Sequence, residues 1–321
     1  MTQFIHFFRI LVVVLGTLVV PHVRAQDFPQ RPIKIIAHIA AGGSGDAQVR
    51  FVAERMSKLL NVPIVIENRT GAGGLVAAGI VKSAPADGYT LLLQGNPGLN
   101  QMLTAATFNF DAEVDFRTIG GLTRNTLVFA VPPDSKLNSV ADIISVKAGG
   151  KPLNVGISAT GYYLVLEWFS KLARTKFSEV RYQGSPQMMQ DLATGRLDWA
   201  IVDLASALPR AKAGQIRIVA VIGNGRHPSV PDVPTVKESG YPEFIYYAWN
   251  AVFVRSETPE PIKNILAEAL RKVLSTAEFS EFVKRFEAEK IDLTPVEFQN
   301  LLVQDLQRYR KLAQEIGFKA E

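Results

Sequence analysis

The stretch from Ile33 to Asp46 has the sequence IKIIAHIAAGGSGD, in which a short apolar run meets a glycine-rich turn. Isoleucine-rich runs of this length are typical of buried strands, so a strand is predicted over residues 33–39. The turn leads into a predicted helix, because apolar residues then recur at the three- and four-residue spacing of a buried helix face. These residues are Val49, Val52, Met56 and Leu59. A strand that enters a helix through such a turn is the first unit of an α/β sheet.

The same pattern continues downstream. Two further strands are predicted over residues 62–67 and 89–93. Between them, the turn Gly71-Ala72-Gly73-Gly74 precedes a helix that ends near Ser83. Strands that alternate with helices in this way form a parallel sheet with right-handed crossovers.

A second α/β series follows the apolar run 127–131 and ends at another extended run, 246–254. Two such runs flanking one series predict that the chain crosses twice between two lobes. We place lobe one at residues 26–125 and 250–321, and lobe two at residues 126–249. The strands predicted in lobe two cover residues 153–157, 180–182, 199–202 and 216–222, and its helices cover residues 163–173 and 186–193.

The C-terminal helices are expected to return to lobe one. The last of them has a clear start, because Thr294-Pro295-Val296-Glu297 combines an N-cap threonine, a first-turn proline and a capping-box glutamate. The predicted fold class is therefore α/β, with two lobes joined by two crossover strands.

Residues 1–25 have the features of a secretory signal peptide. Arg9 gives a weakly positive start, residues 10–20 are apolar, and Val23-Arg24-Ala25 ends in a small residue. The apolar run is too short to span a membrane, which takes about 20 apolar residues. We therefore expect export to the periplasm as a soluble protein. A buried N-terminal helix is the alternative.

The composition excludes several classes of protein. The chain has no cysteine, which excludes disulfides, a thiol nucleophile, cysteine metal ligands and the lipidated cysteine of a bacterial lipoprotein. Loss of residues 1–25 would leave 33 basic and 30 acidic residues. Because lysine and arginine form no dense cluster, this small excess does not indicate nucleic-acid binding, and it suits an anionic small ligand.

Catalytic and cofactor motifs are incomplete. Only His38 and His227 follow the signal segment, and a serine triad needs a histidine beside its nucleophile. The sequence Gly42-Gly43-Ser44-Gly45-Asp46 approaches a nucleophile elbow, but Asp46 stands in place of its last glycine. No glycine turn completes a dinucleotide-binding pattern. We expect no catalytic residue, no cofactor and no transition-metal site, while an all-oxygen calcium site stays open.

Three glycine-rich turns, 41–46, 71–74 and 158–161, precede predicted helices and can bind an anion. The first N–H groups of a helix have no intrahelical partner, and the helix dipole adds partial positive charge there. Glycine also lets a ligand approach the backbone closely. An ordinary loop connection is the alternative for each turn. Asp46 can cap its helix, orient the first turn or meet a ligand ammonium group.

In their order and spacing, the short motifs of this chain resemble the substrate-binding proteins of tripartite tricarboxylate transporters, also called the Bug family. The resemblance covers residues 28–321. The matching segments are Phe28-Pro29, Arg31-Pro32-Ile33, Ala41-Gly42-Gly43 with Asp46 and Arg50, Glu67-Asn68-Arg69, Gly71-Ala72-Gly73-Gly74, Asp87-Gly88-Tyr89-Thr90-Leu91, Asp115-Phe116, Tyr182-Gln183-Gly184-Ser185, Gly195-Arg196-Leu197-Asp198, Arg226, Pro231-Asp232-Val233-Pro234-Thr235 and Glu238-Ser239-Gly240.

The resemblance implies a type II periplasmic-binding-protein fold that closes like a Venus flytrap on a small organic acid or amino acid. It also implies that two loops hold the ligand carboxylate from opposite sides of a cleft. The implied contacts are Ala40, Ala41, Gly42, Gly43, Ser44 and Asp46 in lobe one, Ser158, Thr160 and Gly161 in lobe two, and Gly95, Asn96 and Asp203 at the side.

The second loop departs from the family pattern. It is slightly shorter, and Tyr162 and Tyr163 stand near the point where the family usually has a histidine. His38 stands where the family often has proline. Tyrosine side chains at this loop are expected to narrow the cleft and make it more aromatic, so that the ligand differs from a simple dicarboxylate.

Partners follow from the same resemblance. Besides the ligand, the expected partner is the membrane permease of a tripartite transporter, with no nucleic acid, and the chain is expected to be a monomer. Two other functions stay open. One is a sensor component without a permease, which would use the same liganded surface. The other is an exported α/β hydrolase, against which the incomplete catalytic motifs argue.

Signal cleavage is directly testable. Cleavage is expected after Ala25, which leaves Gln26 as the first residue, because Val23 and Ala25 satisfy the small-residue rule of signal peptidases. Intact mass measurement of protein recovered from the periplasm checks this position. A periplasmic protein that retains Met1 would contradict the prediction.

Overall fold

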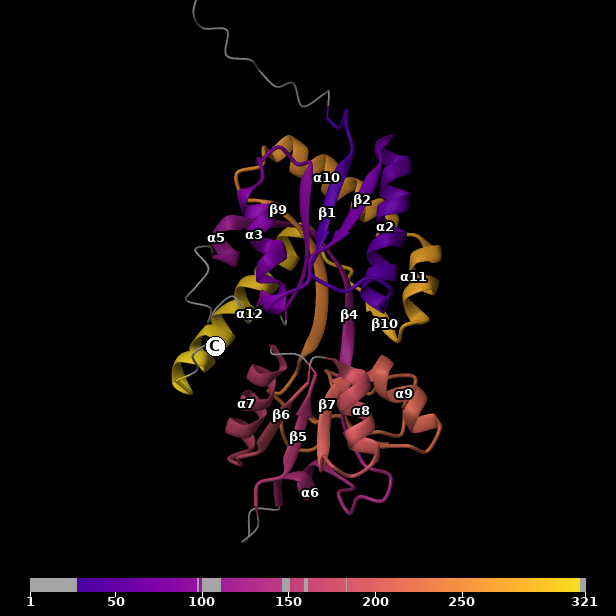
Figure 1. The fold of residues 1–321 in the computed structure, drawn as a ribbon, viewed down its shortest axis with the longest axis vertical. Helices are drawn as coiled ribbons and strands as arrows, with labels where there is room; N and C mark the ends of the chain where they lie inside the picture. The colour runs from indigo at the N-terminus through magenta and orange to yellow at the C-terminus, as the bar shows by residue number, and fades with distance from the viewer. Residues whose placement is uncertain are drawn as a thin grey trace, which may run out of the picture.

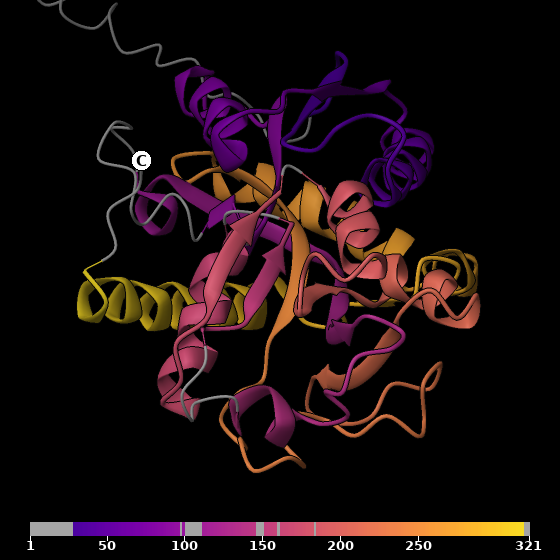
Figure 2. The same cartoon turned by 60° about the horizontal axis from the view of Figure 1, so that its bottom comes forward.

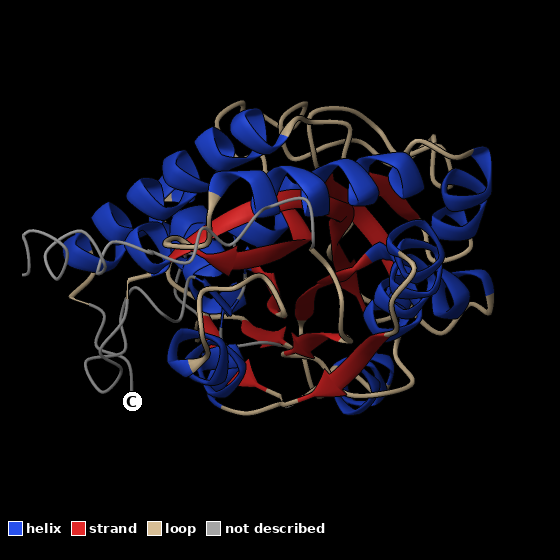
Figure 3. Ribbon diagram, turned by 90° about the horizontal axis from the view of Figure 1, so that it is seen from above, coloured by secondary structure: helices blue, strands red, loops and turns tan. Residues whose placement is uncertain are grey.

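The computed structural model describes residues 28–96, 98–99, 111–145, 151–158, 161–182 and 184–317. The proposed signal segment 1–25 lies outside them. The described elements form two groups, one above the other in Figure 1, and the strands β4 and β9 lie between them. In each group, helices flank the strands (Figure 3).

The first group is built on the parallel strands β1 (Ile33–Ala37), β2 (Ile64–Asn68) and β3 (Thr90–Gly95), with β1 in the middle. Neighbouring residues of β1 enter different cores, since side chains alternate across a strand. Ile35 packs with α2 (Ser44–Leu60), and Ile36 packs with α3 (Leu75–Ser83) on the other face. These elements confirm the strand and helix predictions for this part of the chain, with shifted ends.

The long strand β4 (Phe116–Val131) belongs to both groups. It pairs with β9 (Tyr247–Arg255) up to Thr126 opposite Tyr247. From Leu127 onward it pairs instead with the strands of the second group. The change of partners between Thr126 and Leu127 therefore marks the passage from one sheet to the other.

The first half of β4 was not predicted as a strand, because glycines and charged residues interrupt the apolar pattern there. Gly120 and Gly121 have a packing reason. A Cβ atom on Gly120 would lie 2.9 Å from Leu270, and one on Gly121 would lie 2.7 Å from Phe298. The two glycines thus allow α10 (Glu260–Leu274) to approach one face of the strand and the last helix to approach the other.

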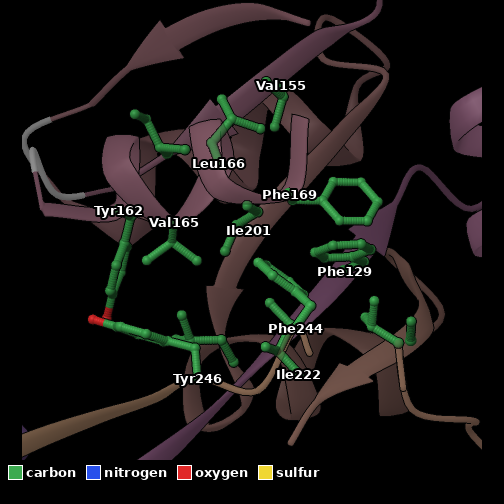
Figure 4. Packing of buried hydrophobic residues seen from close by; sticks show 14 of the residues in the cluster. Phe129, Val155, Tyr162, Val165, Leu166, Phe169, Ile201, Ile222, Phe244 and Tyr246 are labelled. Carbon is green, nitrogen blue, oxygen red and sulfur yellow. The ribbon is translucent and has the colours of Figure 1, made fainter. Parts of the chain in front are cut away.

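The second group contains the parallel strands β5, β6 and β7, while β7 and β8 both pair antiparallel with β4. Phe129 of β4 belongs to its aromatic core, where the Phe129 ring centroid lies 4.9 Å from that of Phe169 (Figure 4). The ring centroid of Trp199 lies 4.8 Å away. The elements are α6 (Val140–Ser145), β5 (Asn154–Ile157), α7 (Gly161–Ala173), β6 (Ser178–Arg181), α8 (Ser185–Ala193), β7 (Trp199–Asp203), α9 (Leu204–Lys212) and β8 (Arg217–Ile222).

The last helix, α12 (Pro295–Glu315), crosses between the two groups. Leu302 and Leu306 belong to a core of the first group, whereas Tyr309 and Leu312 belong to the core around Phe129. In Figures 1 and 2, α12 is the yellow helix that extends toward α7. Besides β4 and β9, α12 therefore also packs against both groups. The lobe boundaries predicted from the sequence remain a prediction.

Smaller elements complete the first group. They are the 3-10 turn η2 (Ala72–Gly74), α5 (Ala112–Asp115), α11 (Ala277–Lys284) and β10 (Ala288–Lys290), which pairs with β4. In the described part of the chain, no helix combines the length and the apolar composition needed to cross a membrane.

The predicted capping box of α12 is confirmed: the Glu297 carboxylate accepts from the Thr294 N–H at 2.8 Å, and the Glu297 N–H donates to the Thr294 hydroxyl at 3.3 Å. Thr294→Ala is expected to lower the free energy of unfolding by about 1 kcal/mol, because it leaves the Glu297 N–H without its side-chain acceptor. Urea unfolding of the mature chain measures this. Val296→Ala, at a 70% exposed position in the same turn, is the control and should change stability little. Equal effects of the two substitutions would contradict the prediction.

Candidate ligand-binding site

The carboxyl ends of parallel strands from both sheets converge on one short stretch of β4. In the first sheet, Gly95 at the end of β3 pairs with Asn250, which pairs with Thr123 of β4. In the second sheet, Asp203 at the end of β7 pairs with Leu127 of β4. Ligands of open α/β sheets bind beyond the carboxyl ends of the strands. The two sets of strand ends therefore define one candidate site between the lobes.

The first loop of the site, between β1 and α2, is the exposed backbone turn 40–43. Gly42 has φ +85°, a conformation that favours glycine, and its N–H donates to Asp46 at 3.0 Å. Gly43 is the N-cap of α2, in extended conformation with no side-chain cap. The N–H groups of the first turn of α2 have no intrahelical partner. The loop thus has the geometry expected of an anion cradle.

Asp46 holds this cradle in shape. Its carboxylate is 4% exposed and accepts hydrogen bonds from Gly42 N–H at 3.0 Å, Arg50 Nε at 2.8 Å and Asn68 Nδ2 at 2.9 Å. Burial acts to raise the pKa of Asp46, but these donors outweigh it and lower the pKa to about 2. Both carboxylate oxygens are engaged by protein donors. Among the three roles considered for Asp46, the geometry favours orientation of the loop.

His38 follows β1 directly, and its Nδ1 lies 3.1 Å from the Leu93 carbonyl oxygen of β3. Burial lowers the pKa of His38 to about 4, so the ring is neutral at pH 7. His227 is also engaged by the backbone, with Nδ1 accepting from the Ser229 N–H at 3.2 Å. The His38 contact thus joins the ends of β1 and β3, whereas the His227 hydrogen bond stabilises a local turn. Within the described residues, no group of three His, Cys, Asp or Glu side chains could hold a metal ion.

At the end of β3, Asn96 is 1% exposed, and both ends of its amide are hydrogen-bonded to β9. Its Nδ2 donates to the Tyr247 carbonyl at 2.8 Å, and its Oδ1 accepts from the Trp249 N–H at 3.0 Å. Neighbouring Gly95 is buried in the sheet. These two residues position the strand end beside β9, and their role as side contacts of a ligand remains a prediction.

Gln94 is a residue of this strand end that sequence reasoning missed. It is fully buried, and a Cβ atom on Gly74 would lie 2.4 Å from its Nε2. A Cβ atom on Gly98 would lie 2.3 Å from the same nitrogen. The glycine at position 74, which the sequence suggested as part of a second anion cradle, is thus also required by close packing against Gln94.

The second loop follows β5, where Ser158 is partly exposed and Gly161 begins α7. Thr160 lies outside the described residues. Tyr162 does not line the site as expected: it is 5% exposed, belongs to the core around Phe129, and its hydroxyl donates to Asp203 Oδ1 at 3.1 Å. The expectation that this tyrosine narrows the cleft is therefore wrong, because the Asp203 carboxylate on the neighbouring strand supplies its hydroxyl with an acceptor.

Tyr163 points in another direction from Tyr162. It is half-buried, and the Arg181 guanidinium lies 4.8 Å from the centre of its ring. A cation over an aromatic face stabilises both side chains. Tyr163 thus packs against β6 at the edge of the second sheet.

Two sheets that share β4, with strand ends facing one another, define the class of the periplasmic binding proteins, and solved structures confirm this fold. Rpa4515 of Rhodopseudomonas palustris, described with adipate, is similar with a TM-score of 0.78 and 30% identity over 91% of this chain and 99% of that chain. MatC of R. palustris, described with bound malate, is similar with a TM-score of 0.76 and 26% identity over 89% and 99%.

Sequence comparison identifies the family. The family described as Tripartite tricarboxylate transporter family receptor matches residues 48–318. A protein encoded in the TAR-I ttuE–ttuC′ intergenic region of Agrobacterium vitis is 33% identical over 273 residues, which is 83% of this chain and 78% of that protein. The chain belongs to the tripartite tricarboxylate transporter receptor family, a family of solute-binding receptors, which confirms the resemblance noted from its motifs.

The Asp46 network generates a stability prediction. Asp46→Ala is expected to lower the free energy of unfolding by about 2 kcal/mol at pH 7, because folding lowers the pKa of this carboxyl from 3.8 to about 2. Because the folded protein lowers the pKa of Asp46, the carboxylate stabilises the fold above pH 4, and this stabilisation is lost as the pH falls toward 2. Urea unfolding at pH 7 and at pH 3 measures it.

The control for Asp46→Ala lies on the same helix. Glu54→Ala removes an exposed carboxylate that pairs with Arg55 and Lys58, and such pairs contribute about 0–1 kcal/mol. If Asp46→Ala is no more destabilising than Glu54→Ala at pH 7, the assigned network does not hold the loop.

Proposed function

We propose that this protein captures a small carboxylate-bearing metabolite between its two lobes and presents it to the permease of a tripartite transporter. The proposal rests on the strand ends at Gly95 and Asp203, which reach β4 at Thr123, by way of Asn250, and at Leu127, and on the shape of the loop 40–43 that follows β1. Backbone N–H groups at a helix start suit a carboxylate. The family and the two relatives described with adipate and malate support the same ligand class.

We further propose that the protein acts in the periplasm and binds its ligand without converting it. The signal features of residues 1–25 support export, and the periplasmic binding proteins of the same fold support the location. His38 is neutral and hydrogen-bonded to a backbone carbonyl, so it is a poor candidate for a catalytic base. The receptor family points to the same conclusion.

The proposed mechanism is closure of the lobes about the crossing strands. The hinge would lie where β4 changes partners, between Thr126 and Leu127, and beside it at Tyr246 and Tyr247. A ligand can shift the open–closed equilibrium only through contacts that differ between the two forms. A carboxylate held by the first loop and contacted by the second lobe would provide such contacts only in the closed form.

A thermal-shift screen of the mature chain against organic acids and amino acids tests the proposal. A true ligand at a hundredfold excess over its Kd should add about 2.7 kcal/mol to the free energy of unfolding. Small-angle scattering then compares the best acid with its methyl ester. The acid is expected to reduce the radius of gyration, and the ester is expected neither to bind nor to compact the protein.

Two outcomes of the scattering experiment would contradict the proposal in different ways. Tight binding of the acid with an unchanged radius of gyration would disprove closure. An ester that compacts the protein as well as the acid does would disprove the carboxylate cradle, whereas closure about β4 would stand.

A further inference from the structure

Asp203 is a carboxylate at the end of β7, where the two sheets meet. It pairs in register with Leu127, next to the point at which β4 changes sheets. It is the N-cap residue of α9, but its side chain makes no capping hydrogen bond. The residue is partly exposed, so this acid borders the space between the strand ends of the two lobes.

The charge of Asp203 has little compensation from the protein. Its carboxylate accepts hydrogen bonds from the Tyr162 hydroxyl, at 3.1 Å, and from its own backbone N–H. Among the described residues, no lysine or arginine forms an ion pair with it, and burial raises the pKa of Asp203. A carboxylate in such surroundings is stabilised by a positively charged hydrogen-bond donor.

A second polar group, close to Asp203, lacks a partner among the described residues. Tyr246 is 3% exposed, and its hydroxyl has no hydrogen-bond partner in the described structure. Figure 4 shows the Tyr162 and Tyr246 rings converging at their hydroxyl ends. Their centroids are 6.3 Å apart and the rings are perpendicular. A phenol oxygen can accept a hydrogen bond from an ammonium group, as a carboxylate can.

Asp46 offers a contrast within the same site. Its carboxylate has an arginine and two further donors, so it has no need of a ligand cation. The anion cradle that Asp46 supports lies in lobe one, and the poorly compensated Asp203 lies in lobe two. A ligand that joins the two would have a negative group on one side and a positive group on the other.

We propose that Asp203 binds the ammonium group of the ligand, and that the ligand is therefore an amino acid. This inference rests on the proposed function, in which the first loop holds the ligand carboxylate. A second carboxylate near Asp203 would be repelled, and a neutral hydroxyl would leave its charge uncompensated. In the closed form, an amino acid would link the cradle of lobe one to Asp203 of lobe two.

Isothermal titration calorimetry of the mature chain tests the inference with acids that differ at one substituent. The sets are succinate, malate and aspartate; glutarate and glutamate; and propionate and alanine. In at least one set, the amino member is expected to bind tenfold or more tighter than the others. Because this comparison uses the unaltered protein, it does not depend on the folding of any variant.

Asp203→Asn then assigns the preference to a residue, since it removes the charge and keeps an oxygen acceptor for the Tyr162 hydroxyl. The amino acid should lose at least tenfold in affinity, and the unsubstituted acid should bind within a few-fold of its original affinity. Asp191→Asn is the control, because Asp191 accepts from the Tyr182 hydroxyl at 2.8 Å in a second Tyr–Asp pair of the same lobe, one whose charge Arg196 already compensates at 3.0 Å. It should leave the preference intact.

Each outcome has a distinct meaning. If succinate or malate binds as tightly as aspartate, with no amino preference in the other sets, the inference is overturned and the proposed carboxylate binder stands. If the preference survives Asp203→Asn, Asp203 is not the ammonium-binding residue, and the inference is also overturned. If no acid of any set binds, the proposed function fails together with the inference.

Discussion

The shared strand β4 is the constraint on which the rest of the structure depends. Its hydrogen bonds pass from β9 to β7 and β8 within one residue step, from Thr126 to Leu127. The parallel strands of both sheets end close to this point of β4, so their carboxyl ends face one another there. The candidate site and the proposed hinge therefore coincide because one strand serves two sheets.

The two acids of the site show how surroundings decide the role of a carboxylate. Asp46 has three protein donors, and its pKa falls to about 2 despite burial. Asp203 has the Tyr162 hydroxyl and its own backbone N–H as donors, with no cation among the described residues, and burial raises its pKa. The first acid is satisfied by the fold and shapes a loop. The second has capacity for a partner that the fold does not supply.

The sequence predicted the strands and helices whose apolar pattern is regular, such as β1 and α2, and it predicted the capping box of α12. The sequence did not predict the first half of β4, where Gly120 and Gly121 allow helices distant in the sequence to pack closely on the strand. It also missed α9, which contains Pro209. The direction of Tyr162 depends on an acceptor forty-one residues away, so no local pattern could place it. Tertiary packing, which periodicity does not encode, decided each of these cases.

The helix α12 limits how the lobes can move. Leu306 is packed in a core of the first group and Tyr309 in the core of the second, within one helical turn. Tyr309 also stacks edge-on with Tyr246 beside the proposed hinge, at 6.2 Å between ring centroids. Because packed cores resist continuous deformation, a large opening would have to separate α12 from one of them. The proposed closure would therefore have to turn about an axis that passes close to residues 306–309. A modest rotation about that axis would move the loop 40–43 relative to Asp203 while both cores stay intact.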